Sequence, residues 1–310
     1  MESLNRMATE LVDEAIDFAE ELTIAVHPLE GDAAVLDFGV EVPGAVEAGL
    51  LLAELQTAGL ATVQTRVDEV AGAPLTHVEL STDHPGLALL CAGKGGWELS
   101  VDGFEGLGSG PARALVAEEP VFQRVGYQEE FEFAVLAVES ESLPDQAVAS
   151  AVAERTGVPE SGVFLPTFRT ASVTGSVVAA ARAAELATYR LSELGYDPRD
   201  VLSATGSAPV APVAGREDSA MARTTDALAY GGQVHLVVES EFDRFDEVVS
   251  TAAAEYGRPV AEVFDDVDWD LTELPVDLFG PAQVTVDVLG GETYVVGETR
   301  PDLLAESFGL

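Results

Sequence analysis

The sequence predicts an α+β fold, with helices and strands mixed along the whole chain. Segments with helical spacing of apolar residues alternate with segments of strand-like alternation, and glycine and proline separate them. The 310 residues are 47% hydrophobic and 23% charged, which is typical of a globular protein with a sizeable core. Because the two kinds of segment mix, a mixed α/β architecture is expected rather than an all-helical or all-strand one.

Helices are expected where apolar side chains recur every three or four residues, as Met7, Leu11, Ala15 and Phe18 do. This spacing and the stop signals predict helices over residues 4–22, 44–57, 85–91, 112–118, 144–155, 173–194 and 242–256. Alternation predicts strands over residues 33–40, 61–67, 76–81, 97–101, 130–138, 234–239, 284–288 and 293–296. The last two strands are predicted to pair as a hairpin, and residues 207–214 to form a loop.

The length suits one large domain or two ordinary ones. We place an N-terminal α/β domain at residues 1–125 and a C-terminal α/β domain at residues 126–310. The longest predicted helix, which carries the candidate catalytic residues described below, lies in the second domain.

The charge balance is strongly acidic. The chain has 55 Asp and Glu residues against 15 basic residues, for a formal charge of −40, and Lys94 is its only lysine. Such a charge repels phosphate backbones, which excludes nucleic acid as a partner. The acids are spread along the chain, which favours adaptation of the whole surface to concentrated salt over one acidic patch for a basic partner.

Cysteine and histidine usage limits the chemistry further. One cysteine, Cys91, allows no internal disulfide, which is typical of a reducing compartment, and we expect a cytoplasmic protein. No signal peptide and no apolar stretch of membrane-spanning length is present, so no membrane association is expected. No metal site is predicted, because metal-ligand spacing is absent among His27, His77, His84 and His235.

Residues 170–189 depart from the rest of the chain. At the average density, 20 residues would hold about three or four acids. This segment holds one, Glu185, and one base, Arg182, among small and apolar residues. A helix of this composition is buried on most sides, and two residues three apart share one face.

Burial favours the neutral form of a carboxyl group, whereas a neighbouring guanidinium favours the charged form. We therefore expect Glu185 to be an ionised carboxylate with little water around it, which suits the positioning of a reacting water. Arg182 would lie beside it. The alternative is a structural buried ion pair.

Two other segments carry candidate binding residues. Residues 106–110 form a glycine-rich stretch before Pro111, where the backbone N–H groups of Ser109 and Gly110 would suit an anion or a ring carbonyl, with Arg113 adding charge. A tight strand-to-helix turn is the alternative. Lys94 lies between two glycines in a chain that otherwise has no lysine, which indicates a functional role for this side chain.

Residues 220–232 hold Arg223, Thr224 and Asp226 close together in the sequence. Arg223 would bind an acidic group, and Asp226 would bind the ring nitrogens of a heterocycle. Capping of a helix is the alternative for Asp226.

At these residues the chain resembles the archaeal methenyltetrahydromethanopterin cyclohydrolase family. The resemblance runs nearly end to end. It comprises Asp37–Val40, Pro43-Gly44, Glu47–Leu50, Gly108–Ala114, Thr170–Ser172, Gly175–Val177, Ala181-Arg182 with Glu185, Arg223-Thr224, Asp226-Ala227, Tyr230–Gly232, Leu278-Phe279, Pro281-Ala282 and Glu306–Phe308. Thr225 and Val178 depart from the Asn and Gln expected there.

The resemblance implies hydrolysis of the cyclic methenyl cation of a reduced pterin to its 5-formyl form. It implies that Arg182 and Glu185 are the catalytic pair and that Tyr230 joins the substrate-binding residues. It also implies two α/β domains with the pocket between them, a homotrimer, and no cofactor, since the pterin carrier is the substrate. The carrier is tetrahydromethanopterin or tetrahydrofolate, and a pterin-binding protein without activity is the non-enzyme alternative.

Overall fold

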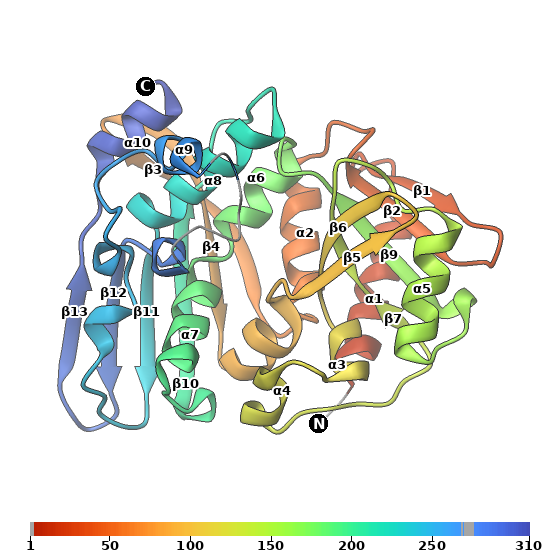
Figure 1. The fold of residues 1–310 in the computed structure, drawn as a ribbon, viewed down its shortest axis with the longest axis horizontal. Coiled ribbons are helices and arrows are strands. Elements are labelled where there is room, and N and C mark those ends of the chain that lie inside the picture. The colour runs from red at the N-terminus through yellow and green to blue at the C-terminus, as the bar shows by residue number, and fades with distance from the viewer. Residues whose placement is uncertain (1–2, 268, 270–275) are drawn as a thin grey trace. The chain divides into compact units, whose positions relative to one another are not determined.

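The computed structural model describes residues 3–267, 269 and 276–310. Contacts divide the chain into two compact units, each assembled from two stretches (Figure 1). Unit 1 comprises Met1–Thr62 and Gly86–Val178, and unit 2 comprises Val63–Pro85 and Ala179–Leu310. The chain therefore passes from one unit to the other three times, and this division differs from the single boundary predicted after residue 125.

Unit 1 is built on a seven-stranded mixed sheet of order β1-β2-β9-β8-β6-β5, with β7 also pairing with β9. The pairs β2–β9, β7–β9 and β8–β9 are parallel, and β1–β2, β5–β6 and β6–β8 are antiparallel. The strands are β1 (Ala25–Pro28), β2 (Ala34–Gly39), β5 (Trp97–Val101), β6 (Phe104–Ser109), β7 (Ala134–Val135), β8 (Ala137–Glu139) and β9 (Val163–Phe168).

The helices of unit 1 complete its core. They are α1 (Leu4–Asp17), α2 (Val46–Gln56), the π-helix η1 (Gly86–Gly93), α3 (Ala112–Val116), α4 (Pro120–Val125), α5 (Gln146–Thr156), the 3-10 turn η2 (Glu160–Gly162) and most of α6 (Val173–Ala180). Helices α3 and α5 bury apolar side chains such as Ala112, Val148 and Val152 against Val35, Trp97 and other residues of the strands. This burial is the main source of the unit's stability.

Unit 2 has a six-stranded sheet of order β13-β12-β11-β10-β4-β3, in which β11 and β12 are parallel. The strands are β3 (Thr62–Val70), β4 (Ala73–Thr82), β10 (Val201–Pro209), β11 (Gln233–Val238), β12 (Gln283–Val288) and β13 (Thr293–Gly297). The antiparallel register of β4 with β10 places strands far apart in the sequence side by side (Figure 1).

The helices of unit 2 are α7 (Ala183–Leu194), α8 (Glu217–Gly231), α9 (Val260–Asp266) and α10 (Pro301–Phe308), with 3-10 turns η3 (Pro198–Asp200), η4 (Phe245–Glu247), η5 (Ser250–Ala252) and η7 (Val276–Phe279). Helices α8, α9 and α10 share one apolar cluster that includes Tyr230, Phe264 and Leu304. Helix α7 packs on strands β10 and β11.

Most predicted elements agree in kind with the structure, including the mixed fold class and the antiparallel hairpin of β12 and β13. Three predicted elements were wrong, and residues 207–209 of the predicted loop belong to β10. The helix predicted at 242–256 is two short 3-10 turns, η4 and η5, and the strand predicted at 130–138 is only β7 and β8. The helix predicted at 173–194 is two helices, α6 and α7, because the N–H of Arg182 donates to the Ala179 carbonyl three residues back (3.1 Å) and tightens the turn.

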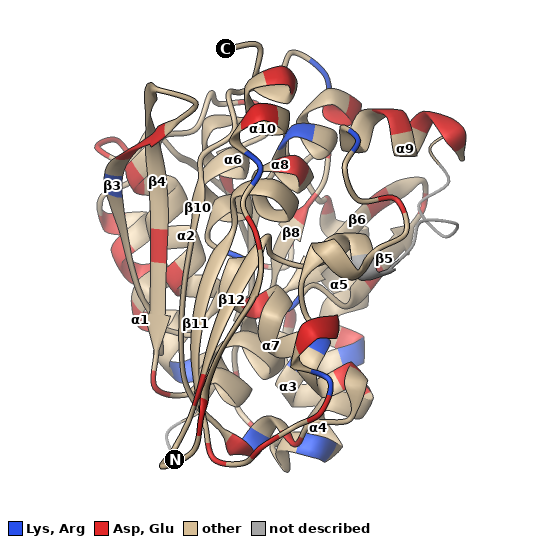
Figure 2. Ribbon diagram, turned by 90° about the vertical axis from the view of Figure 1, so that its left-hand side faces the viewer, with Lys and Arg blue, Asp and Glu red and all other residues tan. Residues whose placement is uncertain are grey.

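Acidic residues lie on helices and loops throughout the described chain, and basic residues are few (Figure 2). This spread is typical of adaptation of a whole surface rather than of one acidic docking patch. None of the helices within the described residues is both long enough and apolar enough to cross a lipid bilayer.

Candidate active site

The predicted catalytic pair lies at the start of α7. Arg182 is the residue before the helix, and Glu185 is the third residue within it. The Arg182 guanidinium donates from Nε to Glu185 Oε2 (3.1 Å) and from NH2 to Oε1 (2.8 Å). A two-pronged contact of this kind orients the carboxylate as well as neutralising it. The first helical turn also favours a negative charge, because the unpaired N–H groups there carry partial positive charge.

The two side chains of the pair differ in their exposure to solvent. The side chain of Glu185 is 6% exposed and that of Arg182 is 34% exposed. The neighbours of Glu185 along α7 are small or apolar, and Ala183, Ala184 and Ala187 are fully buried. The prediction of a buried carboxylate held by one guanidinium therefore agrees with the structure. A carboxylate so placed has accepting lone pairs in a site poor in water.

The position of α7 depends on close contact with the sheet. Gly206 of β10 lies against Ala184, and a Cβ added at Gly206 would come within 2.6 Å of the Ala184 backbone nitrogen. Only glycine allows the strand to approach the helix this closely. The contact fixes the first turn of α7, and with it Glu185.

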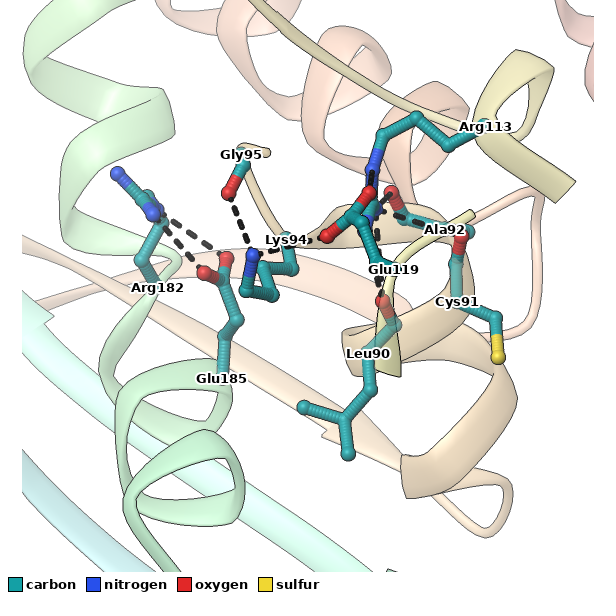
Figure 3. A network of polar contacts seen from close by, with 9 residues as sticks. All are labelled: Leu90, Cys91, Ala92, Lys94, Gly95, Arg113, Glu119, Arg182 and Glu185. Atoms are coloured by element: carbon teal, nitrogen blue, oxygen red, sulfur yellow. Dashed lines mark hydrogen bonds and ion pairs between the residues drawn. The ribbon is translucent and has the colours of Figure 1, made fainter. Parts of the chain in front are cut away.

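In unit 1, Lys94 and Arg113 are brought together by a third residue, Glu119 (Figure 3). Arg113 Nε donates to Glu119 Oε1 (2.7 Å), and Lys94 Nζ donates to Glu119 Oε2 (3.1 Å). Sequence reasoning missed Glu119, although a lone lysine and a buried arginine are signals that a carboxylate partner is nearby.

Ser109 and Gly110 do not form the open backbone cradle that was predicted. Residues 104–109 are strand β6, which pairs with both β5 and β8. The Gly110 N–H donates to the Ala92 carbonyl (2.8 Å), and Ser109 Oγ accepts a hydrogen bond from Gln56 Nε2 (2.9 Å). The structure corresponds to the alternative, a tight strand-to-helix turn between β6 and α3, and the glycines before it allow close packing, as at Gly108 against Leu136.

Four predicted binding residues share α8. Arg223 is half-buried and donates to the Pro212 carbonyl (3.4 Å), and Thr224 Oγ1 donates to the Ala220 carbonyl (2.9 Å) within the helix. Tyr230 is fully buried and donates from its hydroxyl to the Arg258 carbonyl. Both departures from the expected motifs, Thr225 and Val178, are buried.

Asp226 is 1% exposed and uses both carboxylate oxygens inside unit 2. Oδ1 accepts from the N–H of Val260, the first residue of α9 (2.9 Å), and Oδ2 accepts from Ser307 Oγ (2.6 Å). Burial raises the pKa of Asp226 to about 6, the charge of Glu306 adds to the rise, and the two hydrogen bonds oppose it. These contacts correspond to the capping alternative.

Within the described residues, one group has metal-ligand geometry: side-chain atoms of His27, Asp37 and Glu41 lie within 4.8 Å of one another. However, the Asp37 carboxylate already accepts four backbone N–H groups, from residues 39, 40, 41 and 42. Its charge is therefore largely satisfied by the loop that follows β2, which weakens it as a ligand.

Comparison with known proteins identifies the family. A family model described as Cyclohydrolase (MCH) matches residues 3–308. The methenyltetrahydromethanopterin cyclohydrolase of Halobacterium salinarum is 63% identical over 310 residues, covering the whole of both chains. Those of Methanocella arvoryzae and Methanospirillum hungatei are 38% and 36% identical, over all of this chain and 99% of each relative.

The chain belongs to the methenyltetrahydromethanopterin cyclohydrolase family. The resemblance found in the sequence motifs is thereby confirmed. Membership in the cyclohydrolase family covers the full chain, so both units belong to it.

Proposed function

We propose that the protein hydrolyses the methenyl cation of 5,10-methenyl-tetrahydromethanopterin to 5-formyl-tetrahydromethanopterin, with release of one proton. The observation that carries the proposal is the buried carboxylate of Glu185, held by two hydrogen bonds from Arg182, in a chain that matches the cyclohydrolase family from end to end.

The proposed reaction begins with water. Glu185 accepts one proton as the water oxygen bonds to the methenyl carbon, which gives a neutral carbinolamine. The bond from that carbon to the arylamine nitrogen then breaks, the hydroxyl loses its proton to become the formyl oxygen, and the nitrogen gains a proton. The net products are the 5-formyl carrier and the proton that Glu185 returns to solvent.

Arg182 supports this step in two ways. Its guanidinium places a positive charge beside the Glu185 carboxylate and fixes the direction of both carboxylate oxygens. A carboxylate aimed in advance needs less reorganisation when the water attacks, so positioning contributes alongside basicity.

No metal or other cofactor is part of this proposal. The methenyl carbon lies between two nitrogens and shares their positive charge, so it is electrophilic without a Lewis acid. The burden on the protein is to hold the pterin and the water. The proposed binding residues are Lys94, Ser109, Gly110, Arg223 and Thr224, with Arg113, Asp226 and Tyr230, which are buried and bonded within their own units, in supporting positions.

We further propose that the enzyme works in the cytoplasm as a homotrimer. The single cysteine, Cys91, supports a reducing compartment: it is a free, buried thiol, and burial raises its pKa to about 12. The acidic, lysine-poor composition supports a compartment with a high salt concentration.

The decisive experiment follows the absorbance of the methenyl chromophore after protein is added, in concentrated KCl, with the tetrahydromethanopterin and tetrahydrofolate carriers in parallel. Faster decay with the tetrahydromethanopterin carrier is expected. Preference for the folate carrier would support a methenyltetrahydrofolate cyclohydrolase instead. Tight binding of both carriers without decay would support a pterin-binding protein and overturn the proposal.

A further inference from the structure

Arg113 is fixed on every side by its own unit. Its side chain is 1% exposed, and besides Glu119 it donates to the carbonyls of Leu90, Cys91 and Ala92 at 3.1–3.4 Å (Figure 3). The guanidinium also lies over the Phe122 ring, 5.4 Å from its centroid. These contacts tie α3 to the end of η1. They make Arg113 a rigid anchor for the carboxylate that accepts from its Nε.

Glu119 is that partner, and its carboxylate does not cap helix α4. Glu119 is the residue before α4, yet its side chain makes no capping hydrogen bond. Its two oxygens instead accept separately from Arg113 and Lys94. Burial alone would raise the pKa of Glu119, but the hydrogen bonds and charges of Arg113 and Lys94 hold it below its ordinary value.

Lys94 is the residue that this arrangement orients. Its ammonium donates to Glu119 Oε2 (3.1 Å) and to the Gly95 carbonyl (3.0 Å), and its side chain is only 15% exposed. The other 14 basic residues of the chain are arginines. A lysine retained among arginines indicates a need for a compact ammonium with rotatable donors, which a planar guanidinium does not replace.

The glycine at position 96 leaves room for the pair. A Cβ added there would lie 2.5 Å from Glu119 Oε2 and 2.9 Å from Lys94 Nζ. Both atoms are the ends of flexible side chains, so a larger residue at this position would displace the ion pair rather than the backbone. The segment from Lys94 to Gly96 is thus shaped around the contact between Lys94 and Glu119.

We propose that Glu119, anchored by Arg113, is a positioning residue that holds the Lys94 ammonium in place to bind an oxygen acceptor of the pterin substrate. The inference rests on the proposed function and deepens it, because it gives Arg113 a role through Glu119 rather than through direct contact with substrate. An oxygen acceptor is required, since an ammonium would repel the methenyl cation itself.

The test uses the full chain in concentrated KCl and measures KM, kcat and the midpoint of thermal unfolding. Glu119→Gln keeps the size and one acceptor oxygen but removes the charge. We expect KM for the methenyl carrier to rise about tenfold, with kcat within about twofold. The matched control is Glu118→Gln, the neighbouring carboxylate, which pairs with Arg155 at an exposed site. It should leave both kinetic constants unchanged.

Two further variants separate positioning from a purely structural role. Lys94→Met should raise KM by a similar factor, and adding Glu119→Gln to it should raise KM no further, because the acceptor acts only through the ammonium. Gly96→Ala keeps both charges and should raise KM through displacement of the pair, with an unchanged unfolding midpoint. It also tests the proposal if Glu119→Gln fails to fold.

Multiplicative effects in the double variant, or an unchanged KM in Glu119→Gln and Gly96→Ala, would overturn the inference while leaving the cyclohydrolase proposal standing. Wild-type protein that turns over neither carrier would overturn both.

Discussion

Arg182 and Glu185 form a pair with unequal burial: both carboxylate oxygens are bound by the guanidinium, yet 34% of the arginine side chain is exposed against 6% of the glutamate side chain. A purely structural ion pair in a core would bury both partners. Here the carboxylate is withdrawn from water while the guanidinium extends toward it, which is the arrangement that the role proposed for Glu185 requires.

Glu185→Gln should therefore bind the pterin but turn it over poorly. The amide keeps the shape and one acceptor oxygen but cannot take the proton, so we expect kcat to fall by about 10²- to 10⁴-fold. Chromophore decay gives kcat, and fluorescence titration with the formyl product gives binding. Turnover near that of wild type would remove Glu185 from the mechanism.

Arg182→Lys should retain the positive charge and lose the two-pronged contact. One ammonium cannot donate in parallel to both oxygens with the fixed geometry of the guanidinium, so kcat should fall by on the order of tenfold or more. In the Glu185→Gln background the same change should have little further effect, because the two residues act as a unit. Independent, multiplicative losses would argue against that coupling.

Gly206→Ala should disturb the first turn of α7 from the side of the sheet. The new methyl group would press on the backbone of Ala184, next to Glu185, at a cost of about 1–3 kcal/mol of stability and with a loss of kcat. Gly215→Ala is the control, since a Cβ there meets no atom within 4 Å. Equal behaviour of the two variants in thermal unfolding and turnover would show that the close approach is unimportant.

Asp226→Asn should stabilise the protein at neutral pH. The pKa of Asp226 is raised from 3.8 to about 6, so the unfolded chain releases this proton before the folded one does. Stability then falls as pH rises from about 4 to 6, by at most about 3 kcal/mol.

The asparagine carries no charge and can keep both hydrogen bonds, so its advantage in unfolding free energy should grow over that pH interval and level off above it. Denaturant titrations at pH 4, 5, 6 and 7 would measure this difference. An advantage that is constant with pH would mean that Asp226 does not titrate in this range.

Salt should raise the unfolding temperature. With a formal charge of −40, self-repulsion opposes the compact state at low ionic strength. Raising KCl from about 0.1 M to 1 M shortens the screening length from about 10 Å to about 3 Å, so the midpoint of thermal unfolding should rise. Sucrose at the same osmolarity raises the midpoint by exclusion from the protein surface and not by screening, so the rise in KCl should be the larger one. A midpoint independent of KCl would contradict the salt-adaptation interpretation.

Local patterns predicted the features that depend on local chemistry. The hairpin of β12 and β13 follows from Gly290-Gly291 between alternating strands, and the pairing of Arg182 with Glu185 follows from their spacing. Helix α8 was missed because it buries the polar residues Thr224, Thr225 and Asp226 among alanines, so its sequence has no clear apolar periodicity.

Features set by tertiary contacts could not be predicted in this way. The apolar spacing of residues 242–256 predicted a helix, but Phe242 and Phe245 pack instead against Tyr196, and Phe245 also against Tyr294. Glu119 lies 25 residues from Lys94 in the sequence, and only the fold brings them together. The break before α7 was invisible because its small residues suit a continuous helix equally well.

The order of strands in unit 2 has a consequence for synthesis of the chain. Strands β3 and β4 are made early, but β10, to which β4 is bonded, begins 119 residues after β4 ends. A nascent chain therefore carries a hairpin with an open hydrogen-bonding edge while the second stretch of unit 1 is being made. Ribosome-stalled or truncated products ending before Val201 would expose that edge, and they are the species from which aggregation of this protein should begin.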